Sequence, residues 1–131
     1  MSYDFELSCE LPAKPERIYA AWLSSRDHSA MTGGEAEIGD GVGAHYTAWD
    51  GYIEGRNLEL VPGKRIVQSW RTSEFPNDHP DSRVTIELSA IPAGARLRLI
   101  HKGVPDGQTS YETRGWREFY FEPMRAFFSK R

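Results

Sequence analysis

The side chains that could bind a metal ion are scattered along this chain. The four histidines, His28, His45, His79 and His101, lie far apart, and none shows the H-x-x-x-H type of spacing that brings two imidazoles to one metal ion. The sequence therefore predicts no metal site and gives no indication of a cofactor.

Nucleophilic and phosphate-binding motifs are also not apparent. The stretch GDGVG, from Gly39 to Gly43, lacks the G-x-x-x-x-G-K-[ST] spacing of a phosphate loop and precedes a predicted strand, which is typical of a strand entry or bulge. Cys9 lies in an alternating segment without an obvious partner histidine, and there is no G-x-S-x-G motif,. We expect a non-catalytic protein, although carboxylates that meet only in the fold leave acid–base chemistry open.

The aromatic residues carry a more specific signal. The four tryptophans, Trp22, Trp49, Trp70 and Trp116, belong to four different predicted elements. Aromatic side chains dominate protein cores, but they also line ligand pockets together with a few polar groups. We predict a cavity for a small hydrophobic molecule beside the core, lined by Trp70, Trp116, Arg117 and Tyr120, with Met31, Tyr46 and His101 as further candidates.

The segment GWREFYFEPMRAFF, from Gly115 to Phe128, indicates where such a cavity would lie. On a helical wheel its apolar side chains cover roughly 200°, about twice the stripe of an ordinary surface helix. A helix with so wide an apolar face must lie in a groove, which a strongly curved sheet would provide. Arg117 interrupts the apolar arc, either as a stem that reaches solvent at the groove edge or as a buried anchor for an anion or carbonyl.

The boundaries of this last helix follow from three residues. Thr109 and Glu112 fit the T-x-x-E capping box, so the helix should begin near Ser110. Pro123 would remove one helical hydrogen bond and crowd the carbonyl of Phe119. The sequence therefore predicts a kink there, unless another group satisfies that carbonyl.

The rest of the chain supplies the elements of a curved sheet. Residues 3–11 alternate between apolar and polar, which predicts a half-buried strand. Pro15 suits the first turn of a short helix over residues 15–23, and Ser24 and Ser25 can begin a second over 26–31. Further strands follow between turn signals, with Asp50-Gly51 predicting a two-residue hairpin. Gly55 and the run 39–43 are candidate bending points.

Short connections between the strands allow only antiparallel neighbours. We therefore predict an α+β fold in which a curved antiparallel sheet of about six to seven strands wraps around a long C-terminal helix, with two short helices after the first strand. The length of 131 residues fits a single domain over residues 1–131,.

Composition limits the functional classes. The net charge of −3 at pH 7 predicts no binding to nucleic acid. No stretch approaches the ~20 apolar residues that cross a bilayer, and the N-terminus lacks the features of a signal peptide. One cysteine cannot form an intramolecular disulfide,. We expect a cytoplasmic protein without membrane insertion.

Four blocks of the chain, in this order, resemble a known family: PERIYAAW, EGRNLELVPGKRIVQSWR, GARLRLIHKGVPDG and TRGWREFYFEPMRAFF. They are similar to the activators of heat-shock protein 90 ATPase, most of all to the C-terminal domain of that co-chaperone and its single-domain bacterial relatives, within the START-like (SRPBCC) superfamily. The resemblance runs from about Pro12 to the end of the chain. It implies a helix-grip fold, the architecture that the helical wheel also predicts.

The resemblance implies three functional hypotheses. Such folds usually enclose a cavity between sheet and last helix, where many relatives bind lipids, polyketides or other apolar molecules, so the first is a non-catalytic module that binds a small hydrophobic ligand. The second is a co-chaperone-like domain that interacts with a heat-shock protein 90 homologue. The third is a cyclase-like or hydrolytic enzyme that uses the cavity.

Overall fold

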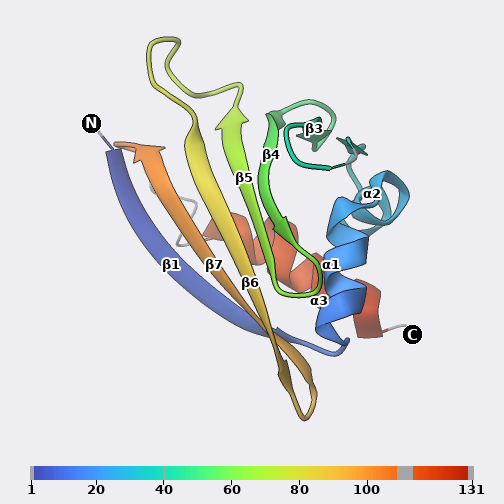
Figure 1. Ribbon diagram of the computed structural model, residues 1–131. Coiled ribbons are helices and arrows are strands. Elements are labelled where there is room, and N and C mark those ends of the chain that lie inside the picture. Colours follow the sequence, from blue (N-terminus) through green and yellow to red (C-terminus); the bar gives the residue numbers. More distant parts are fainter. Residues whose placement is uncertain (1, 40, 109–113, 130–131) are drawn as a thin grey trace.

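The computed structural model describes residues 2–39, 41–108 and 114–129. In this part of the chain seven strands form one antiparallel sheet in the order β1-β7-β6-β5-β4-β3-β2. The strands are β1 Ser2–Leu11, β2 Glu37–Ile38, β3 His45–Ala48, β4 Ile53–Val61, β5 Arg65–Thr72, β6 Ser82–Ile91 and β7 Gly94–Pro105. Figure 1 shows that the sheet is strongly curved. The predicted α+β fold with a bent antiparallel sheet is confirmed.

The two predicted helices follow the first strand as α1 Pro15–Leu23 and α2 Ser25–Thr32. Pro15 opens α1, where its missing N–H is not needed,. The side chain of Ser24 caps α2 by accepting a hydrogen bond from the backbone N–H of Asp27 at 3.1 Å,. Gly33 ends α2 in the left-handed conformation, with a φ of 87°,.

The last helix covers residues 114–129 and contains a π-helix, η2 Arg117–Phe121, that continues into α3 Glu122–Ser129. In η2 the backbone N–H of Glu122 donates to the carbonyl of Arg117, five residues earlier. Pro123 follows directly and has no N–H for the carbonyl of Phe119, so a widened turn replaces regular α-helix at the predicted break. The predicted capping box at Thr109 and Glu112 lies outside the described residues.

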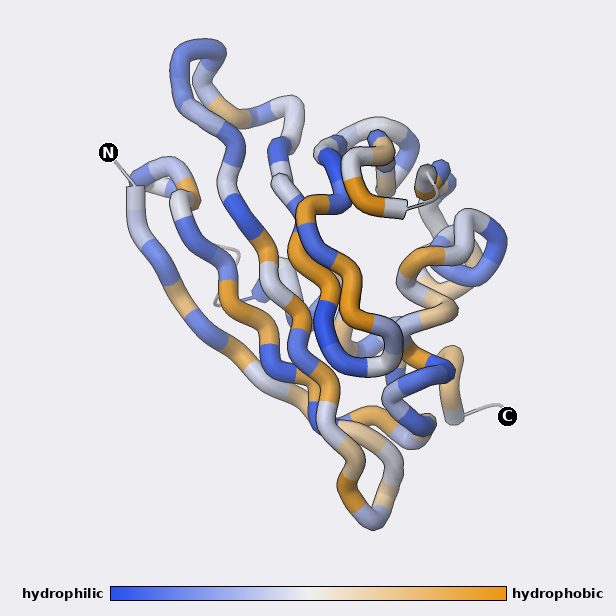
Figure 2. The backbone as a smooth tube through the Cα atoms, viewed as in Figure 1, coloured by the Kyte–Doolittle hydropathy of each residue, from blue (hydrophilic) through white to orange (hydrophobic). Residues whose placement is uncertain are grey.

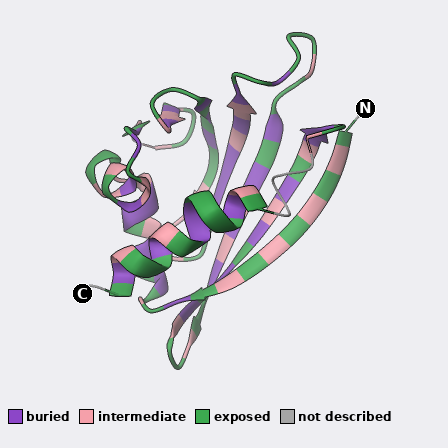
Figure 3. Ribbon diagram, turned by 180° about the vertical axis from the view of Figure 1, so that it is seen from behind, coloured by how far each residue is buried: buried purple, intermediate pink, exposed green. Residues whose placement is uncertain are grey.

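The last helix lies across the concave face of the sheet, with an exposed strip facing away from the strands (Figure 3). Its side chains buried to 5% exposure or less are Trp116, Tyr120, Phe121, Met124 and Phe128. Most of the predicted wide apolar face is therefore buried. Phe127 is only partly buried, and Phe119 departs most, with 53% exposure. A helical wheel assumes α-helical spacing. The π-helix that contains Phe119 changes this spacing and so the direction of its side chain,.

Gly55 allows β4 to approach its neighbours closely. A Cβ atom at this position would lie 1.9 Å from the carbonyl oxygen of Ser69 on β5 and 2.8 Å from the ring of Tyr46 on β3. The hydroxyl of Tyr46 donates to that same carbonyl at 2.7 Å. Farther along β4, the register with β5 shifts between Asn57 and Glu59, which marks a bulge of the kind that bends sheets.

The predicted two-residue hairpin at Asp50-Gly51 is wrong. Ala48 pairs with Ile53, so the connection has four residues. Trp49, Asp50 and Gly51 all have positive φ angles, of 52°, 59° and 89°. A tryptophan rarely adopts this conformation, and a two-residue turn would not require it.

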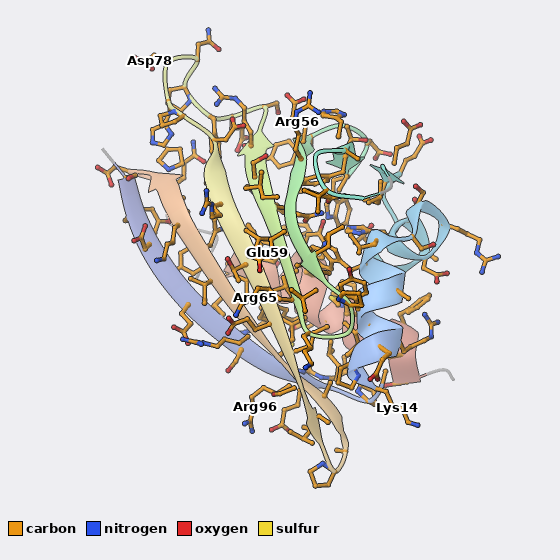
Figure 4. The ribbon with its side chains drawn as sticks, viewed as in Figure 1. Lys14, Arg56, Glu59, Arg65, Asp78 and Arg96 are labelled. Carbon is orange, nitrogen blue, oxygen red and sulfur yellow. The ribbon has the colours of Figure 1, made fainter. Side chains whose placement is uncertain are left out.

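Hydrophilic and hydrophobic residues alternate along the strands (Figure 2). Successive side chains of a strand point to opposite faces, so the two faces of the sheet differ in polarity. The concave face carries the core beneath the helices. The convex face carries ion pairs. Arg98 forms ion pairs with Glu6 and Glu87 at 2.6 and 3.0 Å, and Arg65 forms one with Glu59 at 3.5 Å (Figure 4). Among the described residues, no helix has both the length and the apolar character needed to cross a membrane.

Candidate functional site

An open pocket of about 620 Å³ lies at one end of the last helix. Its walls come from the β3–β4 turn, the end of β5 with the loop after it, the turn after β7, and the helix. The lining residues are Trp49, Tyr52, Ile53, Trp70, Glu74, Gly107, Gln108, Gly115, Trp116, Phe119 and Tyr120.

Aromatic rings form most of this lining and contact one another. The ring centroids of Trp70 and Trp116 are 4.8 Å apart, and those of Trp116 and Tyr120 are 5.0 Å apart. Trp49 and Phe119 meet edge to face at 5.5 Å. The pocket thus has a deep part of buried rings and a rim where Phe119 and Tyr52 reach solvent.

Buried hydrogen bonds fix the ring of Trp116 from behind. Its indole Nε1 donates to Nδ1 of His101 at 3.2 Å. An indole N–H can only donate, so Nδ1 is unprotonated and Nε2 carries the proton, which it donates to Oγ of Ser82 at 2.9 Å. The Ser82 hydroxyl donates in turn to the carbonyl of Trp70 at 2.7 Å.

This direction of hydrogen bonds decides what the Ser82–His101 pair can do. The imidazole presents a proton to the serine oxygen, so it cannot remove the serine proton as a general base would. Burial lowers the pKa of His101 to about 3, which keeps the ring neutral near pH 7. The pair holds Trp116 and Trp70 in place and does not form an activated nucleophile.

A second buried network fixes Tyr120. Nδ1 of His28 donates to the carbonyl of Trp22 at 2.8 Å, since a carbonyl can only accept. Its Nε2 is therefore unprotonated and accepts a hydrogen bond from the hydroxyl of Tyr120 at 3.0 Å. Burial lowers the pKa of His28 and raises that of Tyr120, so both side chains stay neutral and the tyrosine hydroxyl is occupied.

The same network continues away from the pocket. The indole Nε1 of Trp22 donates to Gln68 at 3.1 Å, and Gln68 donates to Asn57 at 2.9 Å. The amide of Asn57 then donates to the carbonyls of Gly39 and Gly41 at 3.2 and 3.0 Å. The glycine run therefore accepts hydrogen bonds through its backbone carbonyls, whereas a phosphate loop donates through its N–H groups.

The polar groups of the pocket lie near its rim. The Tyr52 hydroxyl donates to a carboxylate oxygen of Glu74 at 2.8 Å, and the side-chain amide of Gln108 donates to the backbone carbonyl of Glu74 at 3.1 Å. The indole nitrogens of Trp49 and Trp70 are shielded from solvent and have no hydrogen-bond partner among the described residues.

The structure brings three of the seven predicted site residues together: Trp70, Trp116 and Tyr120 line the pocket. His101 is fully buried behind Trp116 and Trp70. Tyr46 and Met31 are buried in the core outside the lining. Arg117 is exposed on the helix and also lies outside the lining, so its position matches the solvent-reaching stem.

Sequence reasoning did not identify Trp49, Tyr52, Glu74, Gln108 and Phe119 as lining residues. Phe119 was present on the helical wheel as part of the apolar arc. The other four lie on two turns and a loop, whose course over the helix depends on the curvature of the whole sheet. The local sequence carries no signal for that course.

Neither the cysteine nor a cluster of metal-binding side chains provides another reactive site in the described part of the chain. Burial raises the pKa of the Cys9 thiol to about 11, so the thiol stays protonated at neutral pH and is a poor nucleophile. Among the described residues, no three of His, Cys, Asp and Glu lie close enough to hold a metal ion.

Relatives with similar sequences are found among eukaryotic proteins. The human "Activator of 90 kDa heat shock protein ATPase homolog 1" is 28% identical over 116 residues, which are 87% of this chain and 33% of the relative. The mouse homolog 2 is 32% identical over 86 residues, covering 64% of this chain and 25% of the relative. The chain thus spans about a third or less of the length of these relatives.

Solved structures share the fold along nearly the whole chain. A heat-shock protein 90 activator from Plasmodium falciparum superposes with a TM-score of 0.88 at 22% identity, covering 97% of this chain and 96% of the other. A Chromobacterium violaceum protein superposes with a TM-score of 0.75 at 26% identity, covering 96% and 97%.

The family described as "Activator of Hsp90 ATPase homolog 1-like protein" matches residues 12–129. This range includes both short helices, the strands from β2 to β7 and the whole of the described last helix. Sequence and fold agree along this range, and the chain therefore belongs to the Activator of Hsp90 ATPase homolog 1-like family.

Proposed function

We propose that this protein binds a small, largely apolar molecule in the aromatic pocket without transforming it. The observation that carries this proposal is the pocket itself, about 620 Å³ with six aromatic side chains in its lining. Its volume and its mixture of rings with a few polar groups are typical of small-molecule sites.

The buried hydrogen bonds support the proposal because they preorganise the deep wall. His101 holds the ring of Trp116 and His28 holds the hydroxyl of Tyr120. Side chains that are already fixed lose little conformational entropy when a ligand binds. Most of the apolar surface that a ligand would cover therefore contributes to affinity.

The same bonds favour binding over catalysis. The hydroxyl of Tyr120 is committed to His28, and the imidazole of His101 lies behind the indole of Trp116. A general acid or base must reach the proton that it transfers. Glu74 is the one carboxylate among the described lining residues, and it already accepts a hydrogen bond from Tyr52.

A neutral solvatochromic dye tests this proposal. We expect Nile red to brighten on binding, and Phe119→Ser to weaken its binding several-fold, since Phe119 is an exposed rim residue whose loss should not disturb the core,. Leu58→Ser is the matched control, because Leu58 is also a large exposed apolar residue, on β4 and outside the lining. Absent brightening, or equal weakening by both substitutions, would contradict the proposal.

A second function is favoured by the family. We propose that the chain also contacts a heat-shock protein 90 homologue, since several sequence relatives are named as activators of that ATPase. The test is a titration of the labelled chain with the heat-shock protein 90 of the same organism, followed by anisotropy, with the ATPase rate measured in parallel. No binding up to about 100 μM, which corresponds to roughly 5.5 kcal/mol, would remove this candidate.

A further inference from the structure

We infer that the pocket selects an organic cation, an alkylated ammonium group attached to a small apolar body. This inference rests on the proposed binding function and adds the charge of the ligand to it. Three features carry it: the number of rings, the direction of their N–H groups, and the sign of the charge at the rim.

The first feature is the ring lining. Aromatic side chains from the β3–β4 turn, β5 and the last helix surround one open space. An ammonium group is attracted by the electron-rich faces of such rings, and several rings around one cation form the usual cage for quaternary ammonium ligands. A purely apolar ligand would be served equally well by aliphatic side chains, but Ile53 is the only aliphatic residue in the described lining.

The second feature is the direction of the indole dipoles. The N–H of Trp116 is directed to His101, and the indole nitrogens of Trp49 and Trp70 are shielded from solvent. The open part of the pocket therefore meets ring carbons instead of the positive ends of these N–H groups. The Tyr120 hydroxyl is likewise directed away, to His28. A cation in the pocket thus meets no donor from these four side chains.

The third feature is the charge. Glu74 contributes a carboxylate to the rim, and no Lys, Arg or His occurs among the described lining residues. Arg114 and Arg117 flank Trp116 in sequence, but both are exposed outside the lining, and Arg114 bonds Glu118 at 3.0 Å. An anionic head group would meet Glu74 without a compensating cation. Glu74 is exposed, so its effect is screened and the rings dominate,.

Three soluble probes with the same branched head isolate the charge: choline, its neutral isostere 3,3-dimethyl-1-butanol, and the anion 3,3-dimethylbutanoate. Binding is followed at constant ionic strength through the indole N–H signals of the ¹⁵N-labelled protein. Trp49, Trp70 and Trp116 line the pocket, whereas Trp22 does not and serves as an internal control. We expect choline to bind about five-fold more tightly than the neutral isostere, and the anion to bind most weakly.

Substitutions then separate the rings from the carboxylate. Phe119→Leu should weaken choline binding more than binding of the neutral isostere, because it removes a ring and keeps an apolar side chain. Glu74→Gln should weaken choline binding by about two-fold. The matched control is Glu10→Gln, which changes an exposed carboxylate on β1 that forms an ion pair with Arg96. It should leave the affinities for all three probes unchanged.

The outcomes distinguish this inference from the proposed function. Equal affinities for choline and its neutral isostere, or tightest binding of the anion, would overturn the inference and leave the pocket as a binding site. Nile red binding without any choline-induced indole shift would also overturn the inference alone. If neither Nile red nor any of the three probes binds, both fail.

Discussion

The indole nitrogen of Trp116 lies 3.2 Å from Nδ1 of His101, and both side chains are almost completely buried. This bond joins the last helix to β7, and His101 passes the connection on to Ser82 of β6. One neutral imidazole thus ties the helix to two strands and fixes the ring that forms the deep wall of the pocket.

Replacing the imidazole should destabilise the fold. His101→Phe keeps a planar ring but leaves the buried indole N–H of Trp116 without its acceptor, which should cost about 1–3 kcal/mol of unfolding free energy. Urea denaturation measures this loss. The control His45→Phe, at an exposed residue of β3, should change stability by about 0.5 kcal/mol or less. Equal losses in the two variants would contradict the structural role of His101.

The buried histidines also predict loss of stability in acid. Burial lowers the pKa of His101 from 6.5 to about 3 and also lowers that of His28, whereas both side chains titrate near the ordinary value when unfolded. The unfolded chain therefore binds more protons below pH ~6.5, and the stability that is fully present above this pH is lost as the pH falls toward 3.

The shift of His101 corresponds to an upper limit of about 5 kcal/mol at the acid end. Urea denaturation between pH 7 and pH 4 measures the slope, and His101→Phe should make it shallower because the titrating group is gone. A slope that His101→Phe leaves unchanged would show that His101 does not carry a lowered pKa.

The close approach of β3, β4 and β5 at Gly55 predicts a steric effect. In Gly55→Ala the new methyl group would lie 1.9 Å from the carbonyl oxygen of Ser69, so two backbones must separate at a cost of several kcal/mol, about 3 or more. Gly51→Ala is the control: it has a positive φ but no atom within 4 Å of the added Cβ, and should cost about 1 kcal/mol. Thermal or urea unfolding that ranks Gly51→Ala as the more harmful change would contradict the close packing.

Much of this architecture could be predicted from the sequence because local rules and tertiary packing agree there. The alternation in β1, Pro15 at the start of α1 and the Ser24 cap of α2 each have a local cause, and the structure contains all three. The wide apolar arc of the last helix required a curved sheet, and such a sheet is present.

Other features depend on contacts that a single sequence does not display. The β3–β4 connection has four residues instead of the predicted two. Its Trp49 adopts a left-handed conformation and packs against Phe119 and Gly34. The π-helix before Pro123 turned Phe119 outward. Trp70, Trp116 and Tyr120 could be predicted as lining residues because they are aromatic residues on the expected inner faces. The rim residues on turns and loops could not be predicted, because their positions depend on the curvature of the whole sheet.

Two phenylalanines on the last helix can test which side of this helix packs against the sheet. Phe121→Ala should cost about 3–5 kcal/mol because it leaves a cavity in the core, whereas Phe119→Ala should cost about 1 kcal/mol or less. The two residues are 5% and 53% exposed, respectively. The same substitution two positions apart, compared by urea denaturation, thus reports which side faces the sheet. A greater loss for Phe119→Ala would contradict the orientation of the helix.

The ring-lined pocket is the binding site that we propose for this protein. The most direct measurement is a titration of the ¹⁵N-labelled protein with a neutral aromatic probe such as 2-naphthol, observed at the four indole N–H signals. We expect saturable shifts at Trp49, Trp70 and Trp116, which line the pocket, and a much smaller shift at Trp22, whose indole N–H donates to Gln68 outside the pocket. Unchanged signals throughout the titration, or a shift at Trp22 as large as the other three, would contradict this proposal.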